Sequence, residues 1–288
     1  MYIASLIAEP GKLDPSLPVA LRNALGGGDV SWLAQGRAAE FPLPALPAHR
    51  ADIWSQCQGK GVDLNFLTAV GRRKRVLIAD MDSTMIDQEC IDEMAAEAGL
   101  GDSFFEITAR AMNGELDFET ALTERVGLLR GQPVALIDRV LARRISYAAG
   151  GASLVATMRA NGAFAALVSG GFTAFTSAVA AHLGFDEHRA NTLLTDQGVL
   201  SGAVAQPILG RDAKVTALSE ITERLGITAQ DAVAVGDGAN DLGMLGTAGL
   251  GVALHAKPAV QEQADTIINF GDLTSLLYLQ GYCDAELA

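Results

Sequence analysis

The chain has 288 residues, of which 49% are hydrophobic and 19% charged, so it is long enough for about two domains and can bury a large core. Its 21 Lys and Arg residues against 34 Asp and Glu residues give a formal net charge of −13. A field of that sign repels the phosphate backbone of nucleic acids, so we expect no nucleic-acid partner. An anionic substrate would need a local cluster of positive groups.

The cysteines and the hydropathy pattern bear on the compartment. Cys57, Cys90 and Cys283 are far apart and show no CxxC spacing, which favours free thiols in a reducing cytoplasm over a disulfide framework or a zinc site. No apolar run approaches the roughly 18 residues of a membrane helix, and the first residues lack the basic start of a secretory signal. We therefore expect a cytoplasmic protein with no membrane partner.

Residues 1–72 predict a small α+β domain. Strand-like runs and helical stretches follow one another in the order β-α-β-β-α-β, which is typical of a ferredoxin-like sandwich. The basic run at 71–75 then precedes a buried-strand pattern, and we interpret it as a solvated linker at the domain boundary. The expected strands cover 2–8, 30–34, 38–43 and 62–69, and the expected helices 16–25 and 50–58.

Residues 73–288 predict an α/β domain with a parallel sheet. Short apolar runs alternate with helix-like stretches, as in sheets that are covered on both faces. In such sheets the ligand lies at the carboxyl ends of the strands. The expected strands cover 76–79, 163–168, 232–235 and 251–254, and helices are expected near 174–183 and 212–225.

Two acidic groups follow two of these strands. Asp80 and Asp82 lie two residues apart after the first strand and can project toward the same side. Such close like charges need a cation or a proton between them, and Mg²⁺ suits a site of few carboxylates. Asp237 lies between two glycines after a later strand, where a metal ligand is favoured, while Asn240 and Asp241 could be helix caps. For an isolated Asp-x-Asp, an exposed acidic turn is the alternative.

Two further elements could hold an anion. Ser169-Gly170-Gly171 follows the second strand, and backbone N–H groups of glycines can converge on a phosphate there, although a simple tight turn has the same composition. Lys214 lies in the first turn of a predicted helix, where the helix dipole disfavours a cation unless an anion lies nearby.

Together and in this order, these four motifs resemble the haloacid dehalogenase superfamily of phosphotransferases. Residues 80–84 match its DxDx(T/S) motif, and Ser169, Lys214 and residues 236–241 match the second, third and fourth motifs. The stretches DSTMIDQECIDEMA, VSGGF and VGDGANDLGML are similar to the phosphoserine phosphatase family within it. The resemblance implies a Rossmann-like three-layer core, over 73–288, with a helical cap inserted after the first strand at about 87–150. The topology of 1–72 is similar to that of ACT-like amino-acid-binding domains.

The resemblance also implies a reaction and its residues. The expected activity is Mg²⁺-dependent hydrolysis of the small molecule O-phosphoserine through an aspartyl-phosphate, the last step of serine biosynthesis. Asp80 would be the nucleophile, and Asp82 the general acid and then the base. The ion would be held by Asp80, the backbone carbonyl of Asp82, and Asp237, with Asp241 assisting or orienting Lys214. The implied substrate-binding residues are Glu89, Arg125, Ser169, Gly170, Lys214 and Asn240.

Within that set, the resemblance divides the roles. Ser169, the Gly170 N–H and Lys214 would bind the phosphoryl oxygens, and Asn240 would position the substrate or its loop. In the cap, Glu89 suits a substrate ammonium and Arg125 a carboxylate, with Met112 and Phe118 packed around the substrate.

Three alternatives stay open from the residues alone. The chain could be a related phosphatase of another small phosphate monoester, since only Glu89 and Arg125 address an amino acid. It could be a phospho-accepting signalling domain, which the Asp80-x-Asp82 pair and the long insert oppose. It could also be an amino-acid sensor built on residues 1–72. A homodimer is compatible with each of these.

Overall fold

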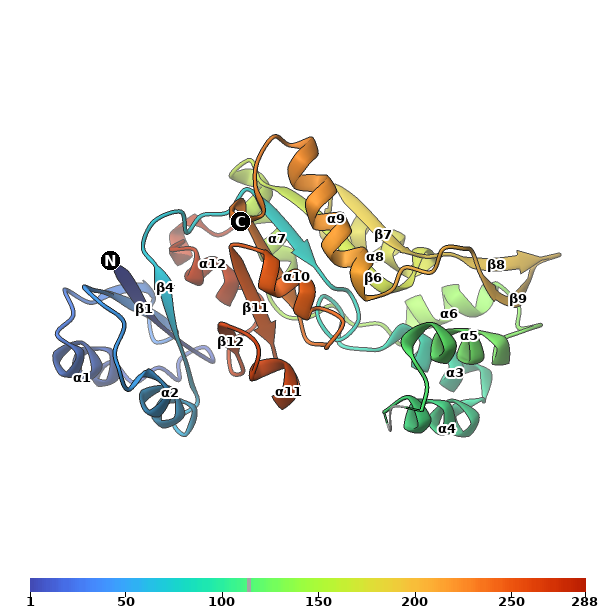
Figure 1. Ribbon diagram of the computed structural model, residues 1–288, viewed down its shortest axis with the longest axis horizontal. Helices are drawn as coiled ribbons and strands as arrows, with labels where there is room; N and C mark the ends of the chain where they lie inside the picture. The colour runs from blue at the N-terminus through green and yellow to red at the C-terminus, as the bar shows by residue number, and fades with distance from the viewer. Residues whose placement is uncertain (113–114) are drawn as a thin grey trace.

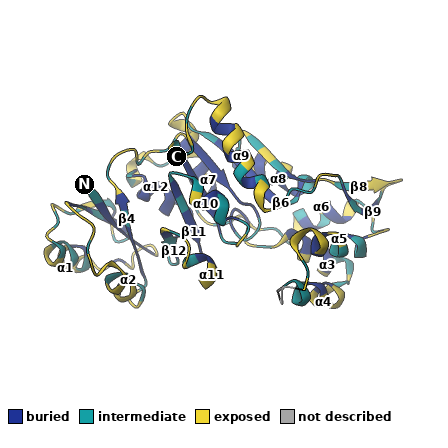
Figure 2. Ribbon diagram, in the orientation of Figure 1, coloured by how far each residue is buried: buried dark blue, intermediate teal, exposed yellow. Residues whose placement is uncertain are grey.

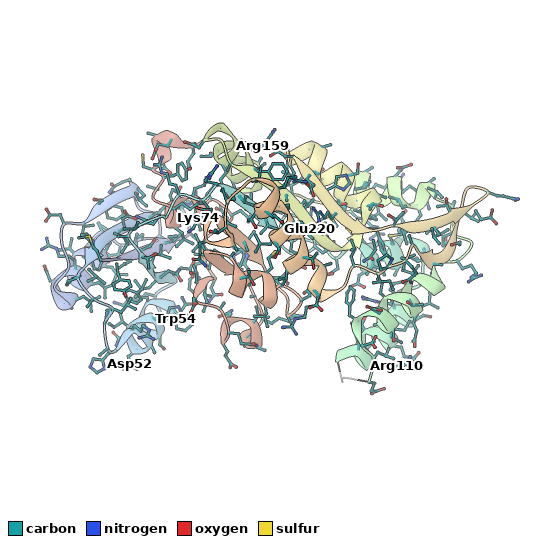
Figure 3. The ribbon with its side chains drawn as sticks, turned by 45° about the horizontal axis from the view of Figure 1, so that its top comes forward. Asp52, Trp54, Lys74, Arg110, Arg159 and Glu220 are labelled. Atoms are coloured by element: carbon teal, nitrogen blue, oxygen red, sulfur yellow. The ribbon has the colours of Figure 1, made fainter. Side chains whose placement is uncertain are left out.

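The computed structural model describes residues 1–112 and 115–288, which form an N-terminal domain, a central α/β core and a helical cap at the opposite end from the N-terminal domain (Figure 1). Figure 3 marks these parts with labelled side chains: Asp52 and Trp54 lie in the N-terminal domain, Lys74 at the junction, Glu220 on the core and Arg110 on the cap. The predicted α/β class is confirmed.

The N-terminal domain contains a four-stranded antiparallel sheet in the order β2-β3-β1-β4. Along β1, Ala4, Leu6 and Ala8 pack in the domain's own core, whereas Ile7 points to the other face and joins the core of the rest of the chain. The sheet is therefore buried on both faces. Its elements are β1 (Tyr2–Ala8), α1 (Ser16–Leu25), β2 (Ser31–Ala34), β3 (Ala38–Leu43), α2 (Arg50–Gln58) and β4 (Val62–Thr68).

The core contains a six-stranded sheet in the order β12-β11-β10-β5-β6-β7, and every neighbouring pair is parallel. The central strands β5 and β10 are dark blue in Figure 2 because helices cover both faces of the sheet, which is why these strands are apolar without alternation. The edge strand β7 is only partly buried. The core elements are β5 (Val76–Ala79), α7 (Gly151–Ala160), β6 (Phe164–Phe172), α8 (Thr173–Leu183), β7 (Glu187–Asn191), α9 (Arg211–Arg224), η1 (Ala229–Asp231), β10 (Ala232–Gly236), α10 (Leu242–Thr247), β11 (Leu250–Leu254), α11 (Pro258–Gln261), β12 (Thr266–Ile268), α12 (Ser275–Leu279) and η2 (Asp284–Glu286).

The cap consists of helices inserted between β5 and α7, as the sequence predicts for about 87–150. A β-hairpin, which the sequence did not predict, runs out from the core and packs against α5 (Figure 1). The side chain of Met112 lies outside the described part of the chain. In the described part, no helix has the length and apolar character needed to cross a membrane. The cap helices are α3 (Cys90–Ala98), α4 (Gly101–Met112), α5 (Phe118–Leu128) and α6 (Ala135–Arg143), and the hairpin strands are β8 (Leu193–Asp196) and β9 (Val199–Val204).

The prediction that 71–75 is a solvated linker is wrong for Arg72 and Lys74, which are half-buried, while Gly71, Arg73 and Arg75 are exposed. The Arg72 guanidinium donates to both carboxylate oxygens of Glu40 and to two backbone carbonyl oxygens of α12. The Arg73 guanidinium lies 4.0 Å from the ring centroid of Tyr282. A run of basic residues looks solvated in sequence because its partners here are distant in the chain.

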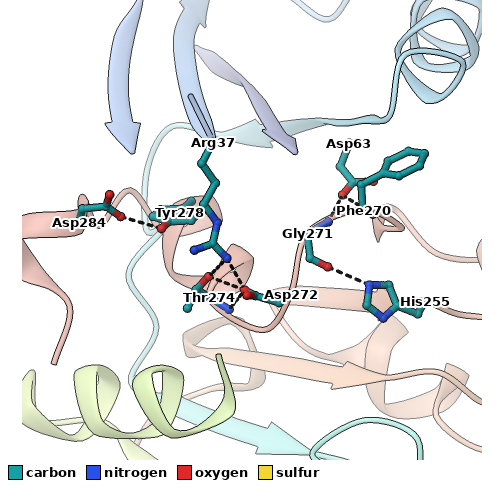
Figure 4. Close-up of polar contacts among 9 residues, drawn as sticks. All are labelled: Arg37, Asp63, His255, Phe270, Gly271, Asp272, Thr274, Tyr278 and Asp284. Atoms are coloured by element: carbon teal, nitrogen blue, oxygen red, sulfur yellow. Dashed lines mark hydrogen bonds and ion pairs between the residues drawn. The ribbon is translucent and has the colours of Figure 1, made fainter. Parts of the chain in front are cut away.

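Buried polar contacts join the N-terminal domain to the loop between β12 and α12 (Figure 4). The Asp63 carboxylate accepts hydrogen bonds from the backbone N–H groups of residues 269–271, at 2.8 to 3.0 Å. Arg37 donates to Asp272 at 2.5 Å and to the hydroxyl of Thr274. Because burying a carboxylate is costly without such partners, Asp63 fixes how this loop meets β4.

We expect Asp63→Ala to lower the free energy of unfolding by about 2 kcal/mol, because three backbone N–H groups lose their acceptor. The midpoint of thermal unfolding should fall by about 4–8 °C. Asp52→Ala is the control, since Asp52 is exposed on α2. Equal midpoints for the two variants would contradict a docking role for Asp63.

Candidate active site

The site is built at the carboxyl ends of the central strands, beginning with Asp80 directly after β5. The backbone N–H of Asp80 donates to the carbonyl oxygen of Val235 in β10, which continues the parallel ladder up to the site. The Asp80 side chain is buried, and its Oδ1 lies 2.7 Å from Nζ of Lys214 on α9. The isolated motifs of β5 and α9 thus meet at one point.

The loop after β10 brings two more carboxylates to this point. Asp80, Asp237 and Asp241 each offer an oxygen, and these oxygens lie within 4.8 Å of one another, so the three residues could hold a metal ion. Gly236 permits the approach, because a Cβ atom there would lie 2.3 Å from Cγ of Asp241. Carboxylate oxygens this close together suit a hard divalent cation, because such ions take oxygen ligands.

Asp241 occupies the N-cap position of α10, which the sequence left open, but its side chain makes no capping hydrogen bond there. Its Oδ1 accepts a hydrogen bond from Nζ of Lys214 at 2.5 Å, and its Oδ2 accepts one from the Gly238 N–H. The buried ammonium of Lys214 therefore lies between Asp80 and Asp241.

The pKa values of the cluster follow from its charges. Burial would lower the pKa of Lys214, but Asp80 and Asp241 outweigh it and raise that pKa, so the ammonium stays charged. Burial and then Asp80 raise the pKa of Asp237 and of Asp241, to about 7 and about 6. One ammonium thus faces three carboxylates, and the excess negative charge favours a further cation.

Asp82 lies beside this cluster and has a different environment. Burial first, and then the charges of Glu89 and Asp80, raise the pKa of Asp82 to about 7. Its Oδ1 accepts a hydrogen bond from the Cys90 N–H, at the start of cap helix α3, at 3.0 Å. Gly171 passes so close that a Cβ atom there would lie 2.7 Å from Asp82 Oδ2. A carboxyl group with such a pKa can both give and take a proton near neutral pH.

Ser169-Gly170-Gly171 does not form a separate tight turn but belongs to the last part of β6, where the register with β7 shifts, next to Asp82. We refer to these three residues as the Ser169 turn. The Gly171 N–H donates to Oγ of Ser169 at 2.8 Å. The ring of Phe118 in the cap lies over the turn, 3.1 Å from the place of a Cβ atom on Gly170. A cleft of about 770 Å³, lined by Phe118 on α5 and by the start of α9, opens beside it.

Glu89 and Arg125 come from two cap helices. Glu89 is the residue before α3, and its Oε1 accepts a hydrogen bond from Oγ of Ser83 at 2.8 Å. Desolvation by the surrounding protein raises the pKa of Glu89, while the hydroxyl of Ser83 and the charge of Arg125 oppose that shift. Arg125 is half-buried on α5, and Asn240 is half-buried in the turn that follows Asp237.

Sequence reasoning missed two contacts here. The Thr84 hydroxyl donates to Oδ1 of Asp237 at 3.3 Å, which links the first and the fourth motif. The T in DxDx(T/S) is a signal that could have indicated this. The hydrogen bond from the Cys90 N–H to Asp82 has no signal in sequence, because any residue except proline could supply it.

Comparisons with known proteins agree with this geometry. A sequence model of the haloacid dehalogenase-like hydrolases matches residues 77–246. The phosphoserine phosphatase of Streptomyces coelicolor is 36% identical over 296 residues, an alignment that covers 99% of this chain and 72% of that protein.

Solved structures with a similar fold are also hydrolases of this kind. A HAD family hydrolase from Salmonella enterica serovar Typhi superposes with a TM-score of 0.88 at 31% identity, covering 97% of this chain and 98% of that one. A phospho-aspartyl intermediate analogue of phosphoserine phosphatase superposes with a TM-score of 0.66 at 38% identity, covering 72% of this chain and 98% of that one. The chain belongs to the haloacid dehalogenase-like hydrolase family.

Proposed function

We propose that this hydrolase acts on O-phosphoserine and releases serine and phosphate through an aspartyl-phosphate on Asp80. One observation carries the proposal: the Asp80 carboxylate lies 2.7 Å from a buried ammonium, with a carboxyl group of pKa about 7 two residues away. That pairing supplies a nucleophile, a positive charge for the phosphoryl group and a proton donor. The phosphoserine phosphatase relatives support the choice of substrate.

In the first step, an Oδ atom of Asp80 attacks phosphorus, and the bond from phosphorus to the serine oxygen breaks. That oxygen takes the proton of the Asp82 carboxyl group and leaves as the serine hydroxyl. The raised pKa of Asp82 keeps a large protonated fraction near neutral pH.

In the second step, Asp82 is ionised and accepts a proton from a water molecule. The oxygen of this water attacks phosphorus of the aspartyl-phosphate, and the bond to Asp80 breaks. Phosphate is released, Asp80 returns as a carboxylate and Asp82 is protonated again, so the site is ready for the next substrate. The closed cap would exclude other water during transfer.

Three groups are assigned to the phosphoryl oxygens: Oγ of Ser169, the N–H of Gly170 and Nζ of Lys214. Lys214 is held by two carboxylates, so its position is fixed before the substrate arrives, and little reorganisation is needed in the transition state. Asn240 is assigned to the loop or the substrate beside them.

We assign Mg²⁺ to Asp80, Asp237 and the backbone carbonyl of Asp82, with Asp241 assisting while it orients Lys214. The oxygen-only donor set and its excess negative charge fit a hard divalent cation. When bound, the ion offsets the repulsion between the nucleophile and the phosphate.

The amino-acid end of the substrate is assigned to the cap. Glu89 would bind the ammonium group and Arg125 the carboxylate. The electrostatic coupling between Glu89 and Arg125 supports this pair, because their opposite charges match a zwitterion. Phe118 would close over the substrate from α5.

A phosphatase of another small phosphate monoester is the second candidate, because the residues at β5, β6, α9 and β10 address only the phosphate. Comparing phosphate release from phosphoserine, phosphothreonine, phosphoethanolamine and sugar phosphates decides between the two. Equal rates without a carboxylate on the substrate would favour the second candidate.

Two further assignments remain proposals. A cytoplasmic location is supported by Cys57, Cys90 and Cys283, all of which are free thiols. A homodimer is compatible with the fold, and sedimentation analysis tests it.

We expect Asp80→Asn to lower kcat for phosphoserine by at least about 1000-fold, because the neutral amide is a poor nucleophile. Far-ultraviolet circular dichroism should match that of the unaltered protein. Asp52→Asn, on the exposed face of α2, should retain full activity. Substantial turnover by Asp80→Asn would refute the assignment of the nucleophile.

Arg125→Ala should raise KM for phosphoserine about 10-fold or more, because it removes the partner of the substrate carboxylate. The KM for phosphoethanolamine, which has no carboxylate, should barely change. Arg139→Ala is the control, since Arg139 lies on cap helix α6 and pairs with Glu97. A similar rise for both substrates would argue against a carboxylate contact.

Asp237→Asn should stabilise the metal-free protein at about pH 8. The folded protein raises the pKa of Asp237 from its ordinary value to about 7. Its ionisation therefore costs stability that grows as the pH rises from about 4 to about 7 and then stays constant. The gain in unfolding midpoint should shrink at about pH 5.

Added Mg²⁺ should make the unaltered protein more stable than Asp237→Asn at about pH 8. It should raise the unfolding midpoint of the unaltered protein and leave that of Asp237→Asn unchanged. An equal rise for both proteins would exclude Asp237 as a ligand.

A further inference from the structure

Asn191, the last residue of β7, joins two segments of the active site. The residue is 2% exposed. Nδ2 donates to the carbonyl oxygen of Gly170 at 2.8 Å, and Oδ1 accepts from the Leu209 N–H at 2.7 Å. Nδ2 also lies 3.4 Å from the carbonyl oxygen of Leu209. One amide group therefore contacts the turn after the apolar part of β6 and the segment before α9.

The contact with Gly170 acts on Ser169 through one peptide group. The carbonyl oxygen of Gly170 and the N–H of Gly171 belong to the same rigid plane. That N–H donates to Oγ of Ser169 at 2.8 Å. Because Oγ accepts this hydrogen bond, its own proton can point toward a phosphoryl oxygen. Asn191 thus fixes the plane that orients the hydroxyl.

Regular pairing between β6 and β7 does not hold the peptide plane between Gly170 and Gly171. The register of β6 and β7 shifts between Val168 and Phe172, and Phe172 is again opposite Asn191. The turn at 169–171 lies within this irregularity. Backbone groups that leave a ladder need other partners, and the Asn191 amide supplies one.

The contact with Leu209 acts on the other side of the phosphate site. Leu209 precedes Gly210, which is the N-cap of α9, and α9 carries Lys214 in its first turn. Leu209 is held through both its N–H and its carbonyl oxygen. The Asn191 side chain therefore connects the Ser169 turn directly to the segment before α9.

We propose that Asn191 is a positioning residue, which holds the Ser169 turn and the start of α9 at the separation that the transferring phosphoryl group requires. The inference rests on the proposed function, because it concerns the phosphoryl end of that site. Asn191 touches neither the substrate nor the reacting atoms and acts through Ser169 and Lys214.

Two variants test this, with Asn65→Ala as the matched control. Asn65 is also a buried asparagine whose amide bonds both backbone groups of one residue, Ile267, but it lies between the N-terminal domain and β12. Asn191→Ala removes all contacts. Asn191→Asp keeps an acceptor for the Leu209 N–H and places an oxygen against the carbonyl oxygen of Gly170.

We expect Asn191→Ala and Asn191→Asp to lower kcat for phosphoserine about 100-fold, since a misplacement of about 1 Å has an effect of that size. Calorimetry with inorganic phosphate should show about 10-fold weaker binding. The loss in kcat/KM should be equal for phosphoserine and phenyl phosphate, because only the phosphoryl end is affected. Asn65→Ala should keep kcat and phosphate affinity, even if its unfolding midpoint falls as much as the midpoints of the Asn191 variants.

Unchanged kcat and phosphate affinity in either folded variant, with only a lower unfolding midpoint, would overturn the proposal. Should Asn191→Ala fail to fold, Asn191→Asp decides by the same two measurements. Failure of the proposed function is distinguishable: the unaltered protein would then release no phosphate from phosphoserine, while the phosphate titrations still compare the variants.

Discussion

The buried ion pairs of Lys214 with Asp80 and Asp241 are the constraint on which the site depends. An ammonium group inside a protein needs carboxylate partners, and these carboxylates come from two different strand ends. The pairs therefore fix α9 against β5 and β10. Three carboxylates against one ammonium leave negative charge unbalanced, which suits the binding of a cation.

The acid–base group and the cap are coupled by the backbone. Asp82 accepts a hydrogen bond from the first N–H of α3, so the group that would move protons is attached to the helix that begins the cap. Phe118, on cap helix α5, lies against Gly170 in the Ser169 turn. Movement of the cap would therefore change the surroundings of the acid and of the phosphate site together, which is how a lid can link closure to chemistry.

The strands of residues 1–72, the core strands β5, β6, β10 and β11, and the helices α1, α2, α8 and α9 could be predicted, because apolar periodicity is a local property. The exceptions have physical reasons. The edge strand β12 has only three residues, and the edge strand β7 carries charged residues, since edge strands are less buried than central ones. Arg72 looked solvated because its partner Glu40 lies far away in the chain.

The sequence by itself determined the element order of residues 1–72, four strands of the core and the chemical groups that follow them, because residue type and periodicity are local properties. Asp80, Ser169, Lys214 and Asp237 were recognisable in that way. Only the tertiary structure decided that the Asp241 side chain pairs with Lys214 and makes no capping hydrogen bond, and that Asn191 joins the end of β6 to the segment before α9. Both roles depend on distances between segments far apart in the chain, and such distances are set by packing and not by local pattern.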